Sequence, residues 1–561
     1  MSLTANSYPA NAPDLYTGPG LRELEETGRS LRLEPSDELL ASFGATATGH
    51  AYIAAEGLRP TEDAYTKLYD EETCEVHVNS RVTLEDYERI TPPQEMARLK
   101  EYAEAMAGKE LLFVNATYAG GGVAIMRAPL VHLLRSVGVN ARWFTMRPDE
   151  EGFKVTKGKF HNVLQDVAKP PGTRLTEEDK GVYEPWLKKV AEDLEEPLTT
   201  ADVIVIDDWQ PSGLIPYIKG FDTVNDGGTE HHTGFNPDAK IIFRDHIHTE
   251  GALMGTPGTP QHTTWKYIWD HNRVNEADVF ITHPMDEFVP PDVPEEKVVF
   301  MPATGDLLDD LNRPLTDGEK RRGLAFINGQ LEENEGQTPV DLNRPYIVLI
   351  ARFDPSKGMP QGMESYVRAR EKMKAEGVKE EELPQLVMLG NGSVDDPDGK
   401  PVLAEVMRIR SERYGDIKDD IKVARVPHND VAINALLKGA SLALQPSTKE
   451  GFESRVSDAI FQGVPVIGSN RGGIPLQIVE GESGYVIDPY DTKQWADRIS
   501  ELMTGSERYK AMKARTAELA VTYNSAFTTV PNATRWLALS TTLLTNPSFQ
   551  GNRRWVEELA A

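Results

Sequence analysis

Two series of short apolar segments, each about as long as one β-strand, constrain the fold of this chain more than any other feature. Segments with helical periodicity follow the apolar segments in both series. Continuous apolar strands that alternate with amphipathic helices are typical of parallel sheets covered on both faces. The pattern predicts an α/β chain with two doubly wound, Rossmann-like domains. The first series is Leu111–Asn115, Val203–Ile206, Ile241–Phe243, Val279–Ile281 and Val298–Met301, and the second is Tyr346–Ile350, Leu386–Leu389, Ile421–Ala424, Leu442–Leu444, Val464–Ile467 and Tyr485–Ile487.

A polar interval rich in glycine and asparagine, Thr316–Arg344, separates the two series. The residues before the first series are polar and mixed in period, with a helix expected near Pro93–Gly108. The last stretch, Tyr509–Ala561, has a helical pattern, and we expect it to pack back across the domain boundary. The expected division is an N-terminal extension over 1–85, a first Rossmann-like domain over 86–325, a second over 340–525 and a C-terminal helical segment over 526–561.

The composition excludes several classes of partner. Lysine and arginine number 60 against 88 aspartates and glutamates, so the formal net charge is −28. Such a charge disfavours nucleic acids and anionic membranes. The single cysteine, Cys74, excludes an intrachain disulfide and disfavours a cysteine-based metal site. No apolar segment has the length of a membrane span, and the first thirty residues lack the pattern of a secretory signal. We therefore expect a cytoplasmic protein.

A glycine-rich turn follows the first apolar segment. Residues directly after a strand are candidates for ligand binding, because open parallel sheets bind ligands at the carboxyl ends of their strands. The sequence from Asn115 to Gly122 ends in three glycines at the expected start of a helix. Glycines let backbone amides approach a ligand, and a helix start offers N–H groups to an anion or a hydroxyl. The fingerprint G-x-G-x-x-G is absent. A tight turn without any ligand explains the pattern equally well.

Cations follow two segments of the second series. Arg352 and Lys357 come after Tyr346–Ile350, and a guanidinium beside an ammonium at a helix start predicts a phosphate site. The alternative is a surface arginine and a capping lysine. After Leu442–Leu444, the segment from Lys449 to Asp458 combines carboxylates, a glycine and Arg455. It also suits an anion, although a capping acid before a helix is the simpler explanation.

Histidines and acids follow two segments of the first series. Strand alternation would place His246 and His248 on one face, but further zinc ligands are missing at metal-site spacing. Asp207 and Asp208 could bind a divalent ion, yet acid pairs at strand ends more often bind hydroxyls or cap helices. We therefore expect a polar sugar-binding edge and no metal site.

Six motifs, in the same order along the chain, resemble those of the retaining glycosyltransferases of family 4, which have the GT-B fold. Within that family the chain is most similar to trehalose synthases of the glycosyl-transferring type and to the retaining trehalose phosphorylases of fungi. The resemblance covers about residues 85–525. The motifs are Leu111–Thr117 with the glycine triplet, Phe160–Gln165, Asp208–Pro211, Arg244–Ile247, Ala351–Gly358 and Glu450–Asp458.

The resemblance implies a role for each matching residue. Arg352 and Lys357 would neutralise the donor phosphate, His246 would contact the transferring glucose near its 6-hydroxyl, and Glu450 would contact it near its 3-hydroxyl. It implies no protein nucleophile and no cofactor, because the donor phosphate or nucleotide-sugar is itself a substrate whose leaving oxygen takes the acceptor's proton. Further substrate-binding positions are Gly121 and Gly122 in the cleft, Asp208, Gln210, His161 and Asn162 on the acceptor side, and His248, Gly451, Phe452, Arg455 and Asp458.

Two departures from the family pattern bear on the substrates, the first on the donor and the second on the acceptor site. The family has two glutamates eight positions apart, the second of which usually holds the ribose of a nucleotide donor, and Asp458 stands at that position here. Asp207 replaces a histidine typical of the synthases. A phosphorylase needs no ribose contact and would gain from Arg455.

The resemblance therefore predicts a trehalose phosphorylase, which converts trehalose and phosphate to α-glucose 1-phosphate and glucose. A nucleoside-diphosphate-glucose-dependent trehalose synthase is the alternative, and a GT-B-shaped sugar-binding protein without turnover is the third hypothesis. The implied partners are sugars with phosphate or a nucleotide-sugar, and a homodimer is one compatible assembly.

Overall fold

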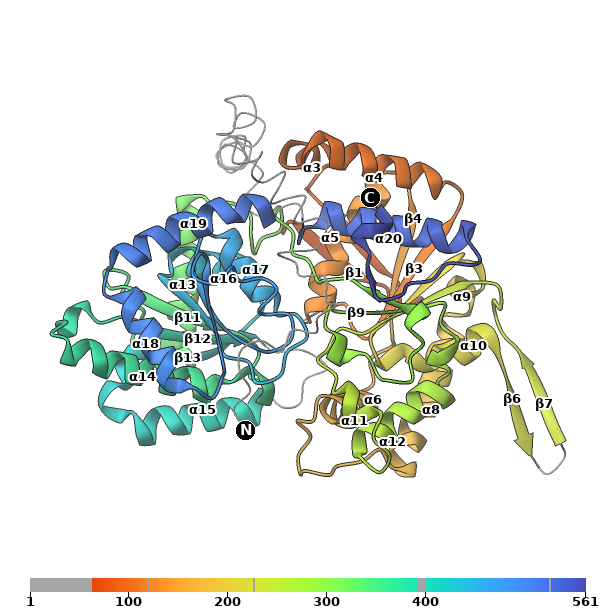
Figure 1. The fold of residues 1–561 in the computed structure, drawn as a ribbon, viewed down its shortest axis with the longest axis horizontal. Coiled ribbons are helices and arrows are strands. Elements are labelled where there is room, and N and C mark those ends of the chain that lie inside the picture. The colour runs from red at the N-terminus through yellow and green to blue at the C-terminus, as the bar shows by residue number, and fades with distance from the viewer. Residues whose placement is uncertain (1–62, 120, 226–227, 392–398, 524–525, 561) are drawn as a thin grey trace.

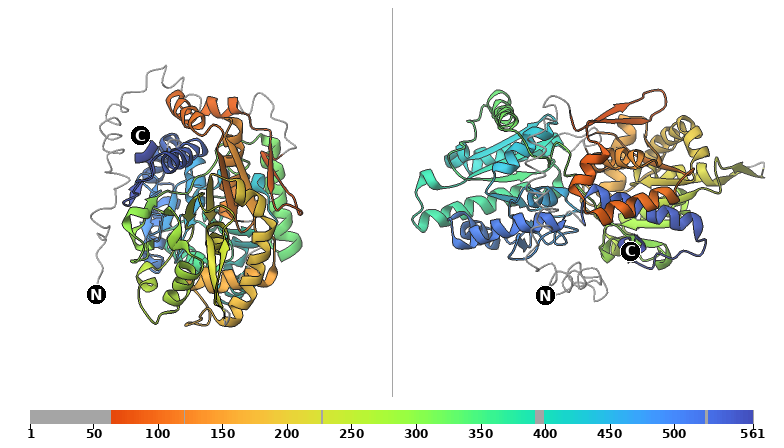
Figure 2. Two further views of the ribbon diagram at one scale, coloured as in Figure 1. Left: turned by 90° about the vertical axis from the view of Figure 1, so that its right-hand side faces the viewer. Right: turned by 90° about the horizontal axis from the view of Figure 1, so that it is seen from above.

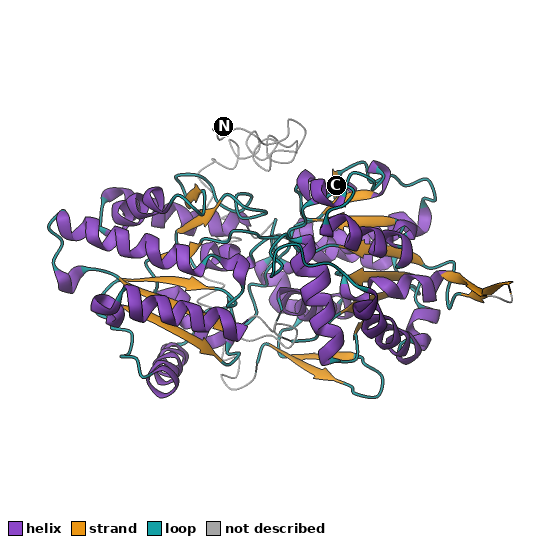
Figure 3. Cartoon of the chain, turned by 90° about the horizontal axis from the view of Figure 1, so that it is seen from below, coloured by secondary structure: helices purple, strands orange, loops and turns teal. Residues whose placement is uncertain are grey.

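Two parallel sheets form the two halves of the chain (Figure 1). The computed structural model describes residues 63–119, 121–225, 228–391, 399–523 and 526–560. One sheet has seven strands in the order β17-β10-β9-β8-β5-β3-β4, and the other has six in the order β13-β12-β11-β14-β15-β16. Helices and strands are interleaved in both halves (Figure 3). The expected pair of doubly wound domains is confirmed.

The first sheet is buried on both faces. Leu112 and Val114 of β3 pack into one apolar cluster, whereas Leu111 and Phe113 of the same strand pack into another. This two-sided burial explains why its strands have continuous apolar sequences. Its strands are β3 (Glu110–Asn115), β4 (Asn140–Thr145), β5 (Val203–Asp207), β8 (Lys240–Arg244), β9 (Val279–Thr282), β10 (Val298–Phe300) and β17 (Arg554–Trp555).

The second sheet has the same construction. Val348 and Ile350 of β11 belong to one apolar cluster, and Ile347 and Leu349 belong to the other. All six apolar segments of the second series form strands of this sheet, as predicted. These strands are β11 (Tyr346–Ile350), β12 (Gln385–Asn391), β13 (Ile421–Val426), β14 (Leu442–Gln445), β15 (Val466–Ser469) and β16 (Gly484–Ile487).

The helix expected near Pro93–Gly108 is present in the first half as α4 (Pro93–Ala105). Glycine occupies the N-cap of α5, where no side chain caps the helix. The other helices are α3 (Leu84–Ile90), α5 (Gly122–Ser136), α6 (Glu150–Val155), α7 (Asn162–Leu164), α8 (Glu177–Asp193), α9 (Glu195–Thr200), α10 (Ile215–Lys219), α11 (Gly251–Met254) and α12 (Pro260–Lys266).

The polar interval between the two series is largely helical. Most of it forms α13 (Asp317–Glu335), which begins with a capping box between Thr316 and Glu319. Ile327 and Leu331 bury the apolar side of this helix in the second core, against α16. The other helices of the second half are α14 (Met359–Ala375), α15 (Gly399–Arg413), α16 (Asp430–Gly439), α17 (Ser454–Phe461), α18 (Thr492–Met503) and α19 (Glu507–Tyr523).

Both ends of the described chain contact the first half. The hairpin of β1 (Tyr65–Tyr69) and β2 (Val76–Ser80) precedes α3, while residues 1–62 of the predicted extension lie outside the described residues. The C-terminal helix α20 (Thr529–Thr545) packs against α4 and α5, and β17 pairs with β10 (Figures 1 and 2). The expected return of the C-terminal segment across the boundary is confirmed. The short helix α21 (Glu557–Ala560) ends the described chain.

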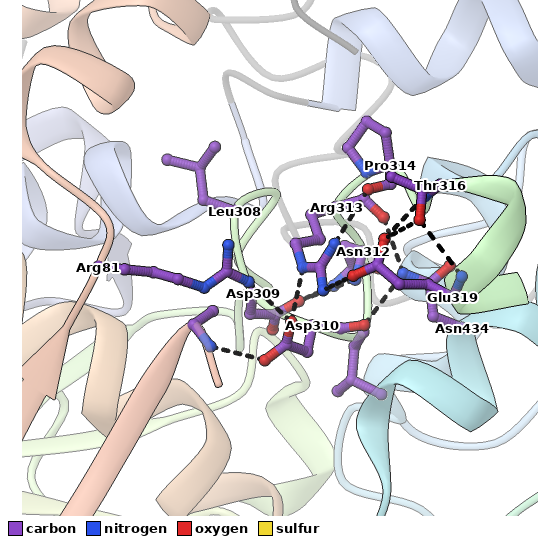
Figure 4. Close-up of polar contacts among 12 residues, drawn as sticks. Arg81, Leu308, Asp309, Asp310, Asn312, Arg313, Pro314, Thr316, Glu319 and Asn434 are labelled. Carbon is purple, nitrogen blue, oxygen red and sulfur yellow. Dashed lines mark hydrogen bonds and ion pairs between the residues drawn. The ribbon is translucent and has the colours of Figure 1, made fainter. Parts of the chain in front are cut away.

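The connection between the two halves is held by a buried polar network (Figure 4). Arg313 donates to Asp310 at 2.6 Å and to Glu319 at 2.7 Å, while Arg81 donates to Asp310 at 3.0 Å. Asn434 of α16 donates to two backbone oxygens of the same segment. These contacts tie the connecting segment to the second half and to the residues just after the N-terminal hairpin.

A second hairpin, β6 (Gly220–Asn225) with β7 (Gly228–Thr233), projects from the first half (Figures 1 and 2). Within the described ranges, no helix combines the length and the apolar character that a membrane crossing requires.

Candidate active site

A cavity of about 240 Å³ lies between the two halves, where the carboxyl ends of strands from both sheets meet. Twelve of the fifteen residues singled out from the sequence line it. From the first half these are Gly121, Gly122, His161, Asp208, Gln210 and His246, and from the second they are Arg352, Lys357, Glu450, Gly451, Phe452 and Arg455. Asn162, His248 and Asp458 do not line the cavity.

The loop after β11 carries the two cations predicted to bind phosphate. Asp354 caps its short helical turn, accepting from the backbone N–H of Ser356 at 2.9 Å and from its hydroxyl at 2.7 Å. Gly358 then adopts a φ of 64°, and an added Cβ would lie 1.9 Å from the carbonyl oxygen of Pro446. The turn therefore requires glycine, and it fixes the directions in which Arg352 and Lys357 enter the cavity.

Lys357 contacts two carboxylates. Its Nζ donates to Glu450 at 2.5 Å and to Glu453 at 2.8 Å. Burial lowers the pKa of Lys357, but the two carboxylates outweigh it and hold this pKa above its ordinary value. Burial raises the pKa of Glu450 to about 7, helped by the neighbouring Glu453 and opposed by Lys357. The ammonium is thus charged at neutral pH, and an incoming phosphate would meet it beside a carboxyl group that can take up a proton.

Glu453 lines the cavity but was not singled out from the sequence. It adopts a φ of 65°, which is uncommon for a residue with a side chain, and it caps α17 by accepting from the N–H of Arg455. Although burial acts to raise the pKa of Glu453, Lys357 lowers it. Left-handed backbone at a residue other than glycine concentrates at functional sites. No sequence signal marks that conformation.

The guanidinium of Arg455 is held by a carboxylate from its own helix. Arg455 donates to Asp458 at 2.7 Å, and Asn312 donates to the other oxygen of Asp458 at 3.2 Å. Asp458 is 3% exposed, and burial raises its pKa. The carboxylate is therefore occupied by protein partners behind the cavity wall.

A buried charge network supports the wall formed by the first half. His246 Nε2 lies 2.5 Å from Asp207, whose second oxygen accepts from Arg127. Burial lowers the pKa of His246 to about 4, although Asp207 opposes this shift, so the imidazole is neutral at pH 7. Arg244 Nε donates to His246 Nδ1 at 3.4 Å, which leaves Nε2 as the protonated nitrogen. Because Asp207 pairs with Arg127 and His246, its carboxylate is not directed at a divalent ion.

The expected acceptor side carries two features that suit hydroxyl groups. Asp208 adopts a φ of 91° at the end of β5, and His161 Nε2 lies 3.6 Å from its carboxylate. Gln210 is 3% exposed, and its Oε1 has no hydrogen-bond partner within the described protein. A buried acceptor without a partner is costly unless a ligand or water satisfies it.

The glycine-rich turn forms the start of α5. Gly121 is the N-cap, no side chain caps the helix, and a Cβ added to Gly121 or Gly122 would meet no atom within 4 Å. The helix start therefore faces open space in the cavity, where its N–H groups can donate to an anion or a hydroxyl.

Three predicted residues lie elsewhere. Asn162 begins α7, and its carbonyl oxygen accepts from the N–H groups of Val167 and Ala168. His248 lies 3.0 Å from Glu250 and packs on Phe288. The alternation expected for His246 and His248 does not apply, because β8 ends at Arg244. Asp458 lies behind Arg455, as described above.

The two halves touch around the cavity. Lys157 of the first half lies 3.0 Å from Asp354 of the second, and Lys449 of the second pairs with Glu250 of the first. A Cβ added to Gly451 would lie 2.4 Å from the carbonyl oxygen of His246. The two backbones are thus in close contact beside Glu450. In the part of the chain that the structure describes, no cluster of three or more histidine, cysteine or acidic side chains could hold a metal ion.

Family models match both halves of the chain. The model described as trehalose synthase, N-terminal domain matches residues 113–290, and the model described as glycosyl transferases group 1 matches residues 331–519.

Two curated relatives carry the similarity over longer spans. The chain is 37% identical over 460 residues to a trehalose phosphorylase of Pleurotus pulmonarius, covering 80% of this chain and 59% of that protein. It is 34% identical over 404 residues to a trehalose synthase of Thermococcus litoralis, covering 72% of this chain and 84% of that protein. The chain thus spans about three fifths of the length of the phosphorylase and most of the synthase.

Solved structures show the same architecture. A trehalose-6-phosphate synthase structure superposes with a TM-score of 0.57 at 12% identity, covering 77% of this chain and 99% of that one. A sucrose-phosphate synthase from Thermosynechococcus elongatus gives 0.52 at 17% identity, covering 78% and 99%. At these identities the likeness concerns the fold alone, and it confirms the expected GT-B arrangement.

Proposed function

Because this chain belongs to the glycosyltransferase family that includes the trehalose synthases and the fungal trehalose phosphorylases, we propose that it is a retaining hexosyltransferase that cleaves trehalose with phosphate. The products are α-glucose 1-phosphate and glucose. The observation that carries the proposal is the cavity, in which Arg352 and Lys357 of one half lie opposite Asp208 and Gln210 of the other. An anion-binding loop opposite a hydroxyl-binding wall suits transfer of a sugar to phosphate.

In the proposed reaction, phosphate binds at Arg352 and Lys357. A phosphate oxygen forms the new bond to the anomeric carbon on the face from which the glucose oxygen leaves, and the phosphate proton moves to that leaving oxygen. The protein contributes position and charge rather than a covalent intermediate. Ionised Glu450 would accept a hydrogen bond from a hydroxyl of the transferring glucose, and Gln210 Oε1 would accept one from the departing glucose.

The state of Asp458 favours phosphate over a nucleotide. The resemblance assigns ribose binding to the carboxylate at this position, but here that carboxylate is bonded to Arg455 and Asn312 and does not line the cavity. Arg455 instead adds a cation to the lining. A small anion would use that cation, whereas a ribose would find no free carboxylate at this point.

The test is incubation of the purified chain with trehalose and inorganic phosphate, with the products identified by mass. We expect glucose and glucose 1-phosphate without any added nucleotide. Absence of phosphate-dependent glucose release would refute the proposal.

Nucleotide-dependent trehalose synthesis is the second candidate. One observation favours it: the chain covers 84% of the Thermococcus litoralis trehalose synthase but only 59% of the Pleurotus pulmonarius phosphorylase. A nucleoside diphosphate at about 100 times its dissociation constant would then add about 2.7 kcal/mol to the free energy of unfolding. No rise in Tm with UDP or ADP would exclude this candidate.

The remaining sequence-based expectations belong to the same proposal. They are the roles of the fifteen site residues, the domain boundaries, catalysis without a metal, a cytoplasmic location and a homodimer. The acceptor-side roles are supported by the position of His161 next to Asp208. The ring of His248 pairs with Glu250, and neither residue lines the cavity.

A further inference from the structure

Lys157 is a buried cation that the reaction proposed above does not use. It lies on a single π-helical turn, Thr156–His161, in the first half of the chain. Its Nζ lies 3.0 Å from Oδ2 of Asp354 in the second half, and the two side chains are 6% and 3% exposed. This ion pair therefore crosses the boundary between the halves at the wall of the cavity.

The partner of Lys157 organises the phosphate-binding loop. Asp354 Oδ1 accepts from the N–H and the hydroxyl of Ser356, and the backbone N–H of Asp354 donates to the carbonyl oxygen of Arg352 at 2.9 Å. Because Asp354 lies between Arg352 and Lys357 and bonds to the backbone of the loop, its position sets where both cations enter the cavity.

The π-helical turn also reaches the expected acceptor side. His161, the last residue of the turn, lies 3.6 Å from Asp208. Phe160 of the same turn is fully buried and packs edge-on against Tyr183 at 5.0 Å, which fixes the turn in the first core. Isolated π-helical turns occur frequently at functional sites. One rigid turn thus contacts the acceptor wall at one end and the phosphate loop at the other.

We propose that Lys157 is a positioning residue whose ion pair with Asp354 holds the Arg352–Lys357 loop in its anion-binding arrangement only while the two halves are closed. In the closed state the loss of Lys157 leaves the buried Asp354 carboxylate without its paired ammonium, whereas in an open state water solvates it. A variant without the ammonium therefore populates the open state more. The identity of the anion as phosphate rests on the proposed function, but the closure does not.

The chain supplies matched controls. Lys159 lies on the same turn, but its Nζ contacts Asp179 and the carbonyl oxygen of Arg174, both in the first half. Lys449 forms the other cross-boundary pair, with Glu250, and it lies outside the phosphate loop. Lys159→Met removes a lysine from the turn without touching the boundary, and Lys449→Met removes a cross-boundary side-chain pair without altering a side chain of the loop.

The experiment compares Lys157→Met with these controls by small-angle X-ray scattering and by calorimetric titration with inorganic phosphate. We expect Lys157→Met to increase the radius of gyration and to weaken phosphate binding at least tenfold. Lys159→Met should change neither, and Lys449→Met should increase the radius but weaken phosphate binding less than Lys157→Met does. In turnover, Lys157→Met should lower kcat/KM for phosphate at least tenfold. Lys157→Arg should retain most of the kcat/KM of the unmodified chain. Asp354→Asn introduced into Lys157→Met should lower kcat/KM little further.

The proposal is overturned if Lys157→Met and Lys159→Met have the same radius of gyration and the same phosphate affinity. It is also overturned if the fold-loss in kcat/KM of the double variant equals the product of the fold-losses of Lys157→Met and Asp354→Asn. If Lys157→Met does not fold, Asp354→Asn, which removes the other charge of the pair, takes its place, with Lys157→Arg as the control that keeps the pair. Absence of phosphate binding in the unmodified chain would refute the proposed function instead, and the scattering comparison would still decide whether Lys157 favours closure.

Discussion

Substitution of Gly451 by alanine tests whether the contact between the two halves beside Glu450 matters for the reaction. Gly451 follows β14, and the Cβ of an alanine there would lie 2.4 Å from the carbonyl oxygen of His246 and 3.2 Å from its carbonyl carbon. The obstacle is backbone of the other half, which cannot rotate away as a side chain can. The backbone conformation of Gly451 is not in the left-handed region, so alanine adds no local strain.

The size of the effect follows from that distance. Real Cβ atoms stay beyond 3.0 Å from such an atom, so the two loops must separate by at least 0.6 Å. Displacements of about 1 Å in an active site cost on the order of 100-fold in rate. We therefore expect kcat/KM to fall by about 10- to 100-fold, which corresponds to about 1.4 to 2.7 kcal/mol of transition-state stabilisation. The free energy of unfolding should change by less than about 1 kcal/mol, because opening of the cavity relieves the contact.

The assay is phosphate-dependent release of glucose from trehalose, measured together with thermal unfolding. Gly329→Ala in α13 is the matched control, because the added methyl group meets no atom within 4 Å. That control should keep full activity and gain up to about 1 kcal/mol of stability, as expected for alanine in a helix. A Gly451→Ala variant with the activity of the unmodified chain would refute the claim that the closed arrangement is the reactive one.

Three further predictions concern the charged residues of the cavity. Arg352→Ala and Lys357→Ala should each lose at least about 2 kcal/mol of transition-state stabilisation, and a loss in kcat/KM below about twofold would contradict their assignment. Asp458→Glu should leave Kd for UDP and ADP unchanged in calorimetric titration if Arg455 keeps the carboxylate occupied; tighter binding would indicate a ribose site. Glu450 ionises near pH 4.5 in the unfolded chain but at about 7 in the folded chain, so the unfolded chain holds fewer protons between these values. Denaturation between pH 5 and 8 should therefore show the unmodified chain losing about 2 kcal/mol relative to Glu450→Gln as the pH rises, and parallel curves would count against the buried carboxyl group.

The strands were predictable to the extent that both of their faces are buried. The predicted segments are continuous apolar runs because alternate residues enter two different cores, as Leu111 and Leu112 do. By contrast β4 (Asn140–Thr145) contains Asn140 and Arg142 and was missed, because Arg142 lies partly at the surface and forms ion pairs there. The helix α13 was missed because glycines and asparagines interrupt its sequence. One of those glycines, Gly323, lets the helix approach Ala432 and Ala435 of α16.

The site was predictable where function follows strand position. Arg352, Asp208 and Glu450 each come after a buried strand, and the parallel arrangement brings such positions to one edge of each sheet. The same rule placed His248 at this edge by assuming that a strand continues past Arg244, whereas β8 ends there and His248 does not line the cavity. Position along the chain thus indicates which edge of the sheet a residue reaches, but not whether its side chain turns into the cavity.

Glu453 and Lys157 show what a single sequence leaves out. Glu453 follows Phe452 in an ordinary loop sequence, and only its left-handed backbone brings its carboxylate to Lys357 while it also caps α17. Lys157 lies far from any predicted strand end, and its partner Asp354 is 197 residues away in the other half of the chain. The Glu453 contact depends on one unusual backbone conformation, and the Lys157 contact depends on how one half meets the other. The periodicity of either half encodes neither of them. Contacts that depend on an unusual backbone conformation, or on the meeting of the two halves, are therefore those that sequence patterns do not reveal.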